Sequence, residues 1–183
     1  WAAPAFAPAA IAIVAWLLQR EKKRLLIIAL GLNLLLVTVV YHWQNLLVAV
    51  NVENPAKKSP FTRAKGWDDL GRQLKPVIQS HPGTVLIADN RTLLAHMLYE
   101  LRDINPPAAS WNPSGVASDH YKLTTDLRPW IGKDAILITQ DPPGDQFTQR
   151  FASMEKLPTL VAPLDALTSR NLDVYLLRGF KGY

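Results

Sequence analysis

The chain has 183 residues, of which 49% are hydrophobic, and a formal net charge of +5 at pH 7. It contains no cysteine, which excludes disulfides, thiolate nucleophiles and cysteine-ligated metals. Four of its 20 basic residues lie in one short segment, 20–24, and the charges after residue 52 are nearly balanced, so no basic face is present to bind a nucleic acid.

Two uncharged apolar segments open the chain, Ala2 to Gln19 and Leu25 to Val52. About 20 helical residues cross a hydrocarbon core of roughly 30 Å, so the second segment is long enough to span a bilayer. The first is shorter and carries Pro4 and Pro8, which the first turn of a helix tolerates. The alternative, the apolar region of a signal peptide, requires a basic leader that this sequence does not show. We therefore predict two transmembrane helices within residues 1–52.

The loop between these segments, residues 20–24, holds four cations. Cytoplasmic loops are enriched in Lys and Arg, so we expect this loop in the cytoplasm and everything after residue 52 outside it. Tyr41, His42 and Trp43 come near the outer end of the second helix, where amphipathic rings favour the headgroup region. The sequence thus predicts a protein of the cytoplasmic membrane with its C-terminal part on the periplasmic or extracellular side.

Residues 53–66 have the composition of a juxtamembrane linker, with prolines, lysines and no hydrophobic period. Lys57, Lys58 and Arg63 follow closely on the second helix. Basic side chains in that position can bind lipid phosphates or a phosphate-bearing substrate. A solvated linker without a ligand is the equally good alternative.

Amphipathic and all-apolar segments alternate from residue 67 to residue 183. A helix is predicted from Trp67, with Pro76 expected to kink it or end it early. Strands are predicted at 84–89, 106–111, 134–140, 159–164 and 173–180, and further helices at 91–103 and 146–157. This alternation predicts an α/β domain, with a mixed or mostly parallel sheet and helices on both faces.

Asp89 and Arg91 follow a predicted strand directly, where α/β folds often place binding groups. Asn90 between them can cap the helix that comes next. The segment lacks the glycines of a phosphate-binding loop, so a helix cap with a surface arginine is the simpler interpretation.

Asp119, His120 and Tyr121 place an acid, a base and a phenol next to one another. In an extended segment His120 points away from the other two, which argues against a shared site. The histidines show no metal-site spacing, and no serine has the glycines of a nucleophile elbow. These residues therefore predict no catalytic group, metal or cofactor.

A series of short motifs follows the basic loop and the second helix in a characteristic order. They are Pro60-Phe61-Thr62-Arg63, Gly66-Trp67, Ala88-Asp89, Leu98-Tyr99, the segment 132–139 and the closing segment 175–182. In this order they resemble the C-terminal end of bacterial family-39 glycosyltransferases. That group is similar to the dolichyl-phosphate-mannose protein mannosyltransferases and the aminoarabinose transferases that act on lipid A, and the resemblance covers essentially the whole chain.

The resemblance implies a polytopic membrane enzyme of the GT-C type. Such an enzyme takes a sugar from a polyprenyl-phosphate carrier and transfers it to a protein, lipid or glycan acceptor outside the cytoplasm. The family's catalytic carboxylate lies in the first outer loop, and nothing here matches that position. The chain is then a C-terminal fragment that is inactive alone, and any divalent metal belongs to the missing part.

In such an enzyme Asp89, Arg91, Asp119, His120 and Tyr121 are the candidates for contact with the acceptor. The rival hypothesis is a non-enzymatic domain, anchored in the membrane, that binds a partner or a component of the cell envelope. The sequence upstream discriminates the two, because an acidic outer loop and many further spans favour the transferase.

Overall fold

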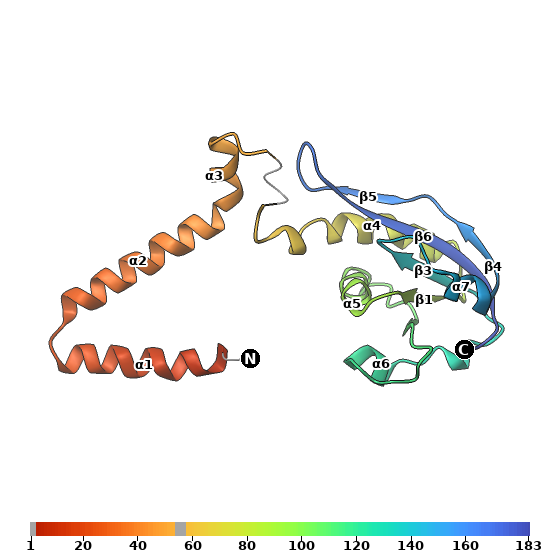
Figure 1. Ribbon diagram of the computed structural model, residues 1–183, viewed down its shortest axis with the longest axis horizontal. Helices are drawn as coiled ribbons and strands as arrows, with labels where there is room; N and C mark the ends of the chain where they lie inside the picture. The colour runs from red at the N-terminus through yellow and green to blue at the C-terminus, as the bar shows by residue number, and fades with distance from the viewer. Residues whose placement is uncertain (1–2, 54–57) are drawn as a thin grey trace. The chain divides into compact units, whose positions relative to one another are not determined.

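The structure is a computed structural model that describes residues 3–53 and 58–183. The chain divides into two compact units, Trp1–Pro60 and Phe61–Tyr183 (Figure 1). The second unit starts earlier than the α/β domain expected from residue 67, because the segment before Trp67 packs on that domain.

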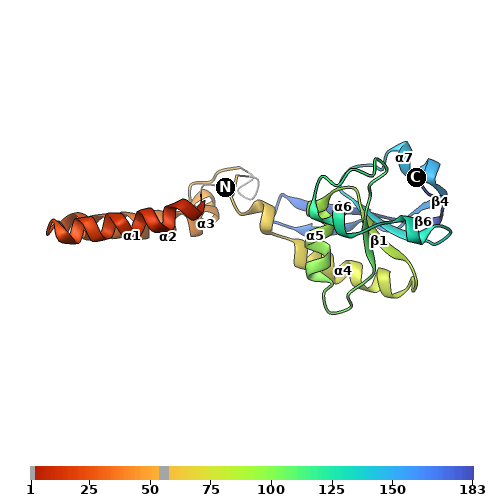
Figure 2. The same cartoon turned by 90° about the horizontal axis from the view of Figure 1, so that it is seen from below.

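The first unit is helical. Its helices are α1 (Ala3–Gln19), α2 (Lys23–Tyr41) and α3 (Trp43–Ala49). α1 and α2 form an antiparallel hairpin (Figures 1 and 2), which turns at Glu21 with a φ of 55°. Among the described residues, α2 alone is long and apolar enough to cross a membrane, whereas α1 has 17 residues and contains Pro8.

No residue of α2 is buried in the structure, and most of its apolar side chains are exposed, whereas Leu26 and Val39 are half-buried. Its two polar side chains within the apolar run donate to carbonyls of the same helix. Asn33 Nδ2 lies 2.9 Å from the Ala29 oxygen, and Thr38 Oγ1 lies 2.8 Å from the Leu34 oxygen. These bonds satisfy the polar donors internally, as an apolar environment requires.

The second unit contains a mixed six-stranded sheet, which confirms the expected α/β class. Its strands are β1 (Val85–Ala88), β2 (Ala108–Ser110), β3 (Ala135–Thr139), β4 (Phe151–Lys156), β5 (Leu160–Pro163) and β6 (Ser169–Phe180). The order is β2-β1-β3-β6-β4, with β5 also paired to β6. β1, β2 and β3 run parallel to one another, and β6 runs antiparallel to β3, β4 and β5.

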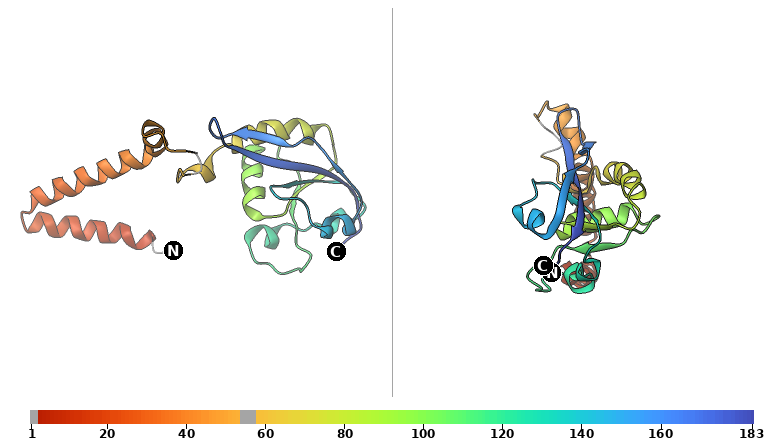
Figure 3. Two further views of the ribbon diagram at one scale, coloured as in Figure 1. Left: turned by 45° about the horizontal axis from the view of Figure 1, so that its top comes forward. Right: turned by 90° about the vertical axis from the view of Figure 1, so that its right-hand side faces the viewer.

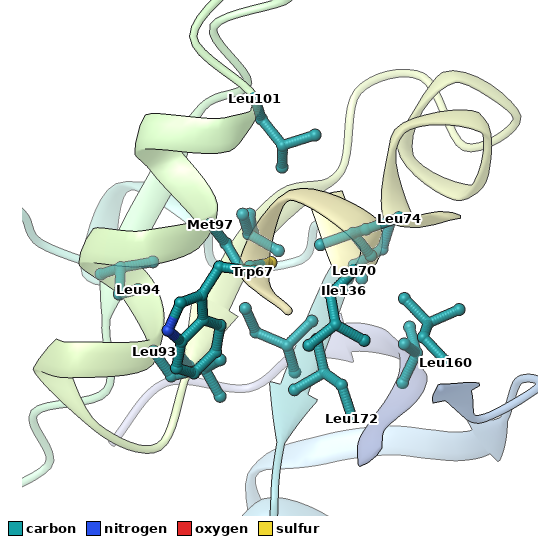
Figure 4. Packing of buried hydrophobic residues seen from close by; sticks show 14 of the residues in the cluster. Trp67, Leu70, Leu74, Leu93, Leu94, Met97, Leu101, Ile136, Leu160 and Leu172 are labelled. Atoms are coloured by element: carbon teal, nitrogen blue, oxygen red, sulfur yellow. The ribbon is translucent and has the colours of Figure 1, made fainter. Parts of the chain in front are cut away.

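Helices cover both faces of this sheet, as the right panel of Figure 3 shows. The helical elements are η1 (Thr62–Ala64), α4 (Trp67–Gln79), α5 (Arg91–Glu100), α6 (His120–Thr124), η2 (Arg128–Trp130) and α7 (Asp145–Arg150). Because side chains alternate along a strand, β1 directs Leu86 to one face and Ile87 to the other. α4 and α5 cover the first face (Figure 4), and α7 and η2 cover the second.

One local prediction was wrong. The helix predicted over 146–157 ends at Arg150, and β4 begins at Phe151. The long strand β6 offers an unpaired edge there, and Phe151 pairs with Phe180 on it, so sheet hydrogen bonds outweigh the helical spacing. Of the two outcomes expected at Pro76, early termination of α4 does not occur, because the helix continues to Gln79.

The segment before α4 belongs to the folded domain. Arg170 Nη2 donates to the Thr62 carbonyl at 2.8 Å, and its Nε donates to the Lys65 carbonyl at 3.1 Å. Gly66 adopts a φ of +79°, and a Cβ there would lie 2.9 Å from Leu164 Cδ2. The strands β5 and β6 therefore hold residues 62–66 from one side.

Candidate functional site

The strand order reverses between β1 and β3. The connection from β1 to β2 carries α5 on one face of the sheet, whereas the connection from β2 to β3 ends in η2 on the other. In open α/β sheets, ligands bind at the carboxyl ends of the strands where this reversal occurs. That position holds Asp89 after β1, and Thr139 and Asp141 at the end of β3.

A hydrogen-bond clamp joins these strand ends. Thr139 is only 1% exposed, and its Oγ1 lies 2.8 Å from Asp89 Oδ2 and 2.6 Å from the Asp141 carbonyl oxygen. The Asp141 amide donates to the same Oγ1 at 3.1 Å, and Asn90 Nδ2 donates to Asp89 Oδ1 at 2.8 Å. The hydroxyl thus has one proton for two acceptors, and both Asp89 oxygens are engaged.

Asn90 caps α5, as expected, because its Oδ1 accepts from the Leu93 amide at 2.9 Å. Arg91 is the first residue of α5 and is exposed, as is Asp89. The strand end therefore presents a carboxylate and a guanidinium to solvent. These groups can bind hydroxyls or other polar ligands.

The expectation that 119–121 is extended holds for Asp119 alone, since His120 and Tyr121 begin α6. Asp119 Oδ1 accepts from the Lys122 amide at 3.0 Å, so this carboxylate caps the helix. His120 is exposed, and its ring meets the half-buried Tyr121 ring edge-on at 5.9 Å between centroids. A short helix thus replaced the extended segment because Asp119 can cap it.

A polar hollow of about 330 Å³ lies beside the end of β2 and α6. It is lined by Ser110, Asn112, Pro113, Ser114, Gly115, Lys122, Leu123, Thr124, Thr125, Asp126, Leu127, Arg128 and Tyr183. The Ser110 amide donates to Thr125 Oγ1 at 2.9 Å, and the Asn112 amide donates to the Tyr183 hydroxyl at 2.9 Å. The last residue of the chain therefore closes on the loop after β2.

Two of the charged residues that line this polar hollow, Asp126 and Arg128, form an ion pair. Arg128 Nη2 lies 2.8 Å from Asp126 Oδ2, and the Arg128 amide also donates to Asp126 Oδ1. The hydrogen bond from the Arg128 backbone amide lowers the pKa of Asp126 most, and the Arg128 guanidinium lowers it further. Together they hold this pKa below its usual range. Burial raises the pKa of the Tyr183 phenol, so this group keeps its proton at neutral pH. The hollow combines hydroxyls, an amide and a fixed ion pair, which suits a ligand rich in hydroxyl groups.

Sequence reasoning missed this hollow. The segment 112–115 (Asn-Pro-Ser-Gly) and the spacing of Asp126 and Arg128 were available as a signal of an ordered polar turn. The contribution of Tyr183 was not, because only the fold brings the C-terminus there. None of Asp119, His120 and Tyr121 lines the hollow.

The three predicted phosphate-binding cations fall in different places. Lys57 lies outside the described residues. Lys58 is exposed in the first unit, where its carbonyl accepts from the Trp43 indole at 3.1 Å. Arg63 is exposed in η1 of the second unit, and its carbonyl accepts from the Trp67 indole at 2.7 Å.

The fold and these sites define a class of protein. It is an α/β domain with a mixed sheet that follows an exposed apolar helix and carries two polar surfaces, the strand end at Asp89 and the polar hollow. No protein-family model, curated protein or solved structure matches the chain. Within residues 3–53 and 58–183, no group of three or more His, Asp or Glu side chains could hold a metal ion.

Proposed function

We propose that this chain is the C-terminal part of an integral membrane glycosyltransferase. The enzyme moves a sugar from a polyprenyl-phosphate carrier to an acceptor outside the cytoplasm. The observation that carries this proposal is α2, an apolar helix without a single buried residue, which precedes a separate α/β domain. Apolar surface is stabilised by roughly 25 cal/mol for each Å² removed from water, which favours a lipid environment for α2.

Different parts of such an enzyme supply the groups that sugar transfer needs. A carboxylate base accepts the proton of the acceptor hydroxyl, and cations stabilise the departing lipid phosphate. We assign the phosphate contacts to Lys57, Lys58 and Arg63, which follow the apolar helices in the chain. The base belongs to a part of the enzyme beyond this chain.

The α/β domain supplies contacts to the acceptor in this proposal. Asp89 and Arg91 at the strand end, and the hydroxyl and amide groups of the polar hollow, match the hydrogen-bonding groups of a saccharide or a peptide. Asp119, His120 and Tyr121 on α6 adjoin Lys122, which lines that hollow.

The experiment is a transfer assay with the complete reading frame that contains this chain. The purified protein is reconstituted in liposomes with polyprenyl-phosphate mannose, glucose or aminoarabinose and a cell-envelope extract as the source of acceptor. We expect sugar incorporation into the extract and release of polyprenyl phosphate. A folded protein that uses none of the lipid-linked sugars contradicts the proposal.

A second function, ligand binding by an anchored domain, is favoured by the polar hollow, in which Asp126 is paired with Arg128 rather than with a nucleophile. Saturable binding of envelope glycans by the complete protein, without any sugar transfer, is the outcome that selects it. The same reconstituted sample serves both measurements.

A further inference from the structure

The turn between β5 and β6 exposes an apolar tip. Leu167 is 74% exposed, although the turn around it is ordered by hydrogen bonds. The Leu164 amide donates to the Thr168 carbonyl at 2.8 Å, and the Leu167 amide donates to Asp165 Oδ1 at 2.9 Å. Leu167 contributes nothing to the domain's own core. Single exposed leucines are common on protein surfaces, so the meaning of Leu167 depends on the groups that surround this turn.

This turn lies at the end of the domain where the chain arrives from the apolar helices. Arg170, at the start of β6, binds the carbonyls of Thr62 and Lys65, and Leu164 packs on Gly66. The eleven residues 50–60 are all that separate α3 from Phe61. The turn is therefore at the part of the domain that is most closely tethered to α2.

The same end of the domain carries the groups that a lipid surface binds. Arg63 is exposed and Phe61 is 37% exposed. The half-buried Arg170 guanidinium is instead held by the Thr62 and Lys65 carbonyls and by the Trp67 ring. Cations near an anionic membrane bind its phosphates, while exposed apolar side chains enter the headgroup boundary. Asp165 is the acidic residue of the turn, and its carboxylate is engaged by the Leu167 amide.

The direction of the strands places the turn at the carboxyl edge of the parallel strands. β6 pairs antiparallel with β3, with Asp173 opposite Thr139, so residues 169–172 extend past the carboxyl end of β3. The clamp formed by Asp89 and Thr139 lies at that same edge. Docking of the turn would thus direct the Asp89 edge towards the membrane.

We propose that residues 164–168 are a membrane-docking element, with Leu167 inserted in the headgroup region of an anionic bilayer and Arg63 bound to lipid phosphate beside it. This inference rests on the membrane location of α2 in the proposed function. It adds a second attachment point, which fixes how the α/β domain faces the lipid surface.

The absence of cysteine makes a direct test practicable, because one introduced cysteine is the single labelling site. The full chain is reconstituted in vesicles of phosphatidylcholine and phosphatidylglycerol after Leu167→Cys is labelled with an environment-sensitive fluorophore. Ile131→Cys is the matched control, since Ile131 is 57% exposed just before β3, at the opposite edge of the sheet. Leu34→Cys on α2, 69% exposed, reports the membrane location itself.

We expect nitroxide-bearing lipids to quench the labels at positions 34 and 167 several-fold more than the label at position 131, with blue-shifted emission at 167. Quenching at 34 combined with equal quenching at 167 and 131 overturns the docking element and leaves the membrane location intact. A label at 34 that no lipid quenches overturns the membrane location. A label at 167 shielded from both lipid nitroxides and aqueous iodide indicates a protein partner and also contradicts the inference.

Discussion

At the residue scale, Thr139 shows how one buried hydroxyl connects two strands. Its Oγ1 contacts Asp89 Oδ2 and both backbone groups of Asp141. Leaving a buried donor or acceptor without a partner costs about 1–3 kcal/mol, and more for a charged group. The clamp therefore contributes to the stability of the same edge that we assign to acceptor contact.

Thr139→Val tests this clamp, because valine keeps the shape of threonine and removes the hydroxyl. We expect the free energy of unfolding of the second unit to fall by roughly 1–3 kcal/mol, measured by urea denaturation with tryptophan fluorescence. Thr148→Val is the matched control, since the Thr148 hydroxyl is exposed and bonds only to the Asp145 carbonyl. Equal effects of the two substitutions would contradict the role of the clamp.

His96 provides a pH dependence with a defined sign. Its ring stacks on Trp67 at 4.2 Å between centroids, and burial first, then the charge of Arg170, lowers its pKa below the ordinary value of 6.5. The folded protein therefore resists protonation that the unfolded chain accepts. The stability contributed by neutral His96 is present above pH 6.5 and is lost as the pH falls from there towards the lowered pKa.

We expect the thermal midpoint of the second unit to fall as the pH is lowered below 6.5, and His96→Phe to remove part of that fall. Thermal unfolding followed by near-ultraviolet circular dichroism at several pH values measures it. His120→Phe is the comparison, because His120 is exposed in α6. An unchanged pH profile in His96→Phe would show that another group is responsible.

At the element scale, the sequence predicts best where a side-chain pattern has one physical explanation. The apolar runs of β1 and β3 fit only buried strands, and Asn90 marks the start of α5. The pattern of 146–157 fits a helix as well as a strand, and the free edge of β6 decides between them. The polar hollow was not predictable because it depends on Tyr183, far along the chain from Asn112.

Gly66→Ala tests the packing of residues 62–66 on the β5–β6 turn. Alanine is strained at a positive φ, by about 1–3 kcal/mol, and its Cβ would also meet Leu164. Gly83→Ala is the control, because Gly83 has a φ of +83° and open space around it. We expect Gly66→Ala to lower the melting temperature of the second unit further than Gly83→Ala does. Equal losses would mean that residues 62–66 do not pack tightly on the domain.

At the scale of the whole molecule, the charge pattern of residues 20–24 predicts opposite locations for the two ends of α2. Reporter fusions in that loop and after Tyr183 should report the cytoplasm and the outside, respectively. A cytoplasmic signal from the C-terminal fusion would contradict both the topology and the transferase proposal.

Two groups of polar residues should affect different substrates of the proposed transferase. The cations Lys58 and Arg63 should affect use of the lipid-linked donor, and Asp119 and His120 should affect use of the acceptor. Lys58→Ala combined with Arg63→Ala removes two exposed cations, each worth about 1 kcal/mol near an anionic surface. We expect a higher apparent KM for the lipid-linked donor in a liposome assay. Asp119→Ala and His120→Ala should change acceptor preference or folding instead. Unchanged donor dependence in the double variant, with transfer abolished in a folded His120→Ala protein, would reverse the two assignments.

The position of β6 has a consequence for biosynthesis. This last strand pairs with β3, β4 and β5, and the final residue, Tyr183, closes the loop after β2. The sheet is therefore incomplete until β6 and Tyr183 have left the ribosome, so the domain folds only after these residues are translated. A stop codon after Asp173 should leave α1 and α2 inserted while the rest is degraded, which pulse-chase labelling with protease treatment can follow.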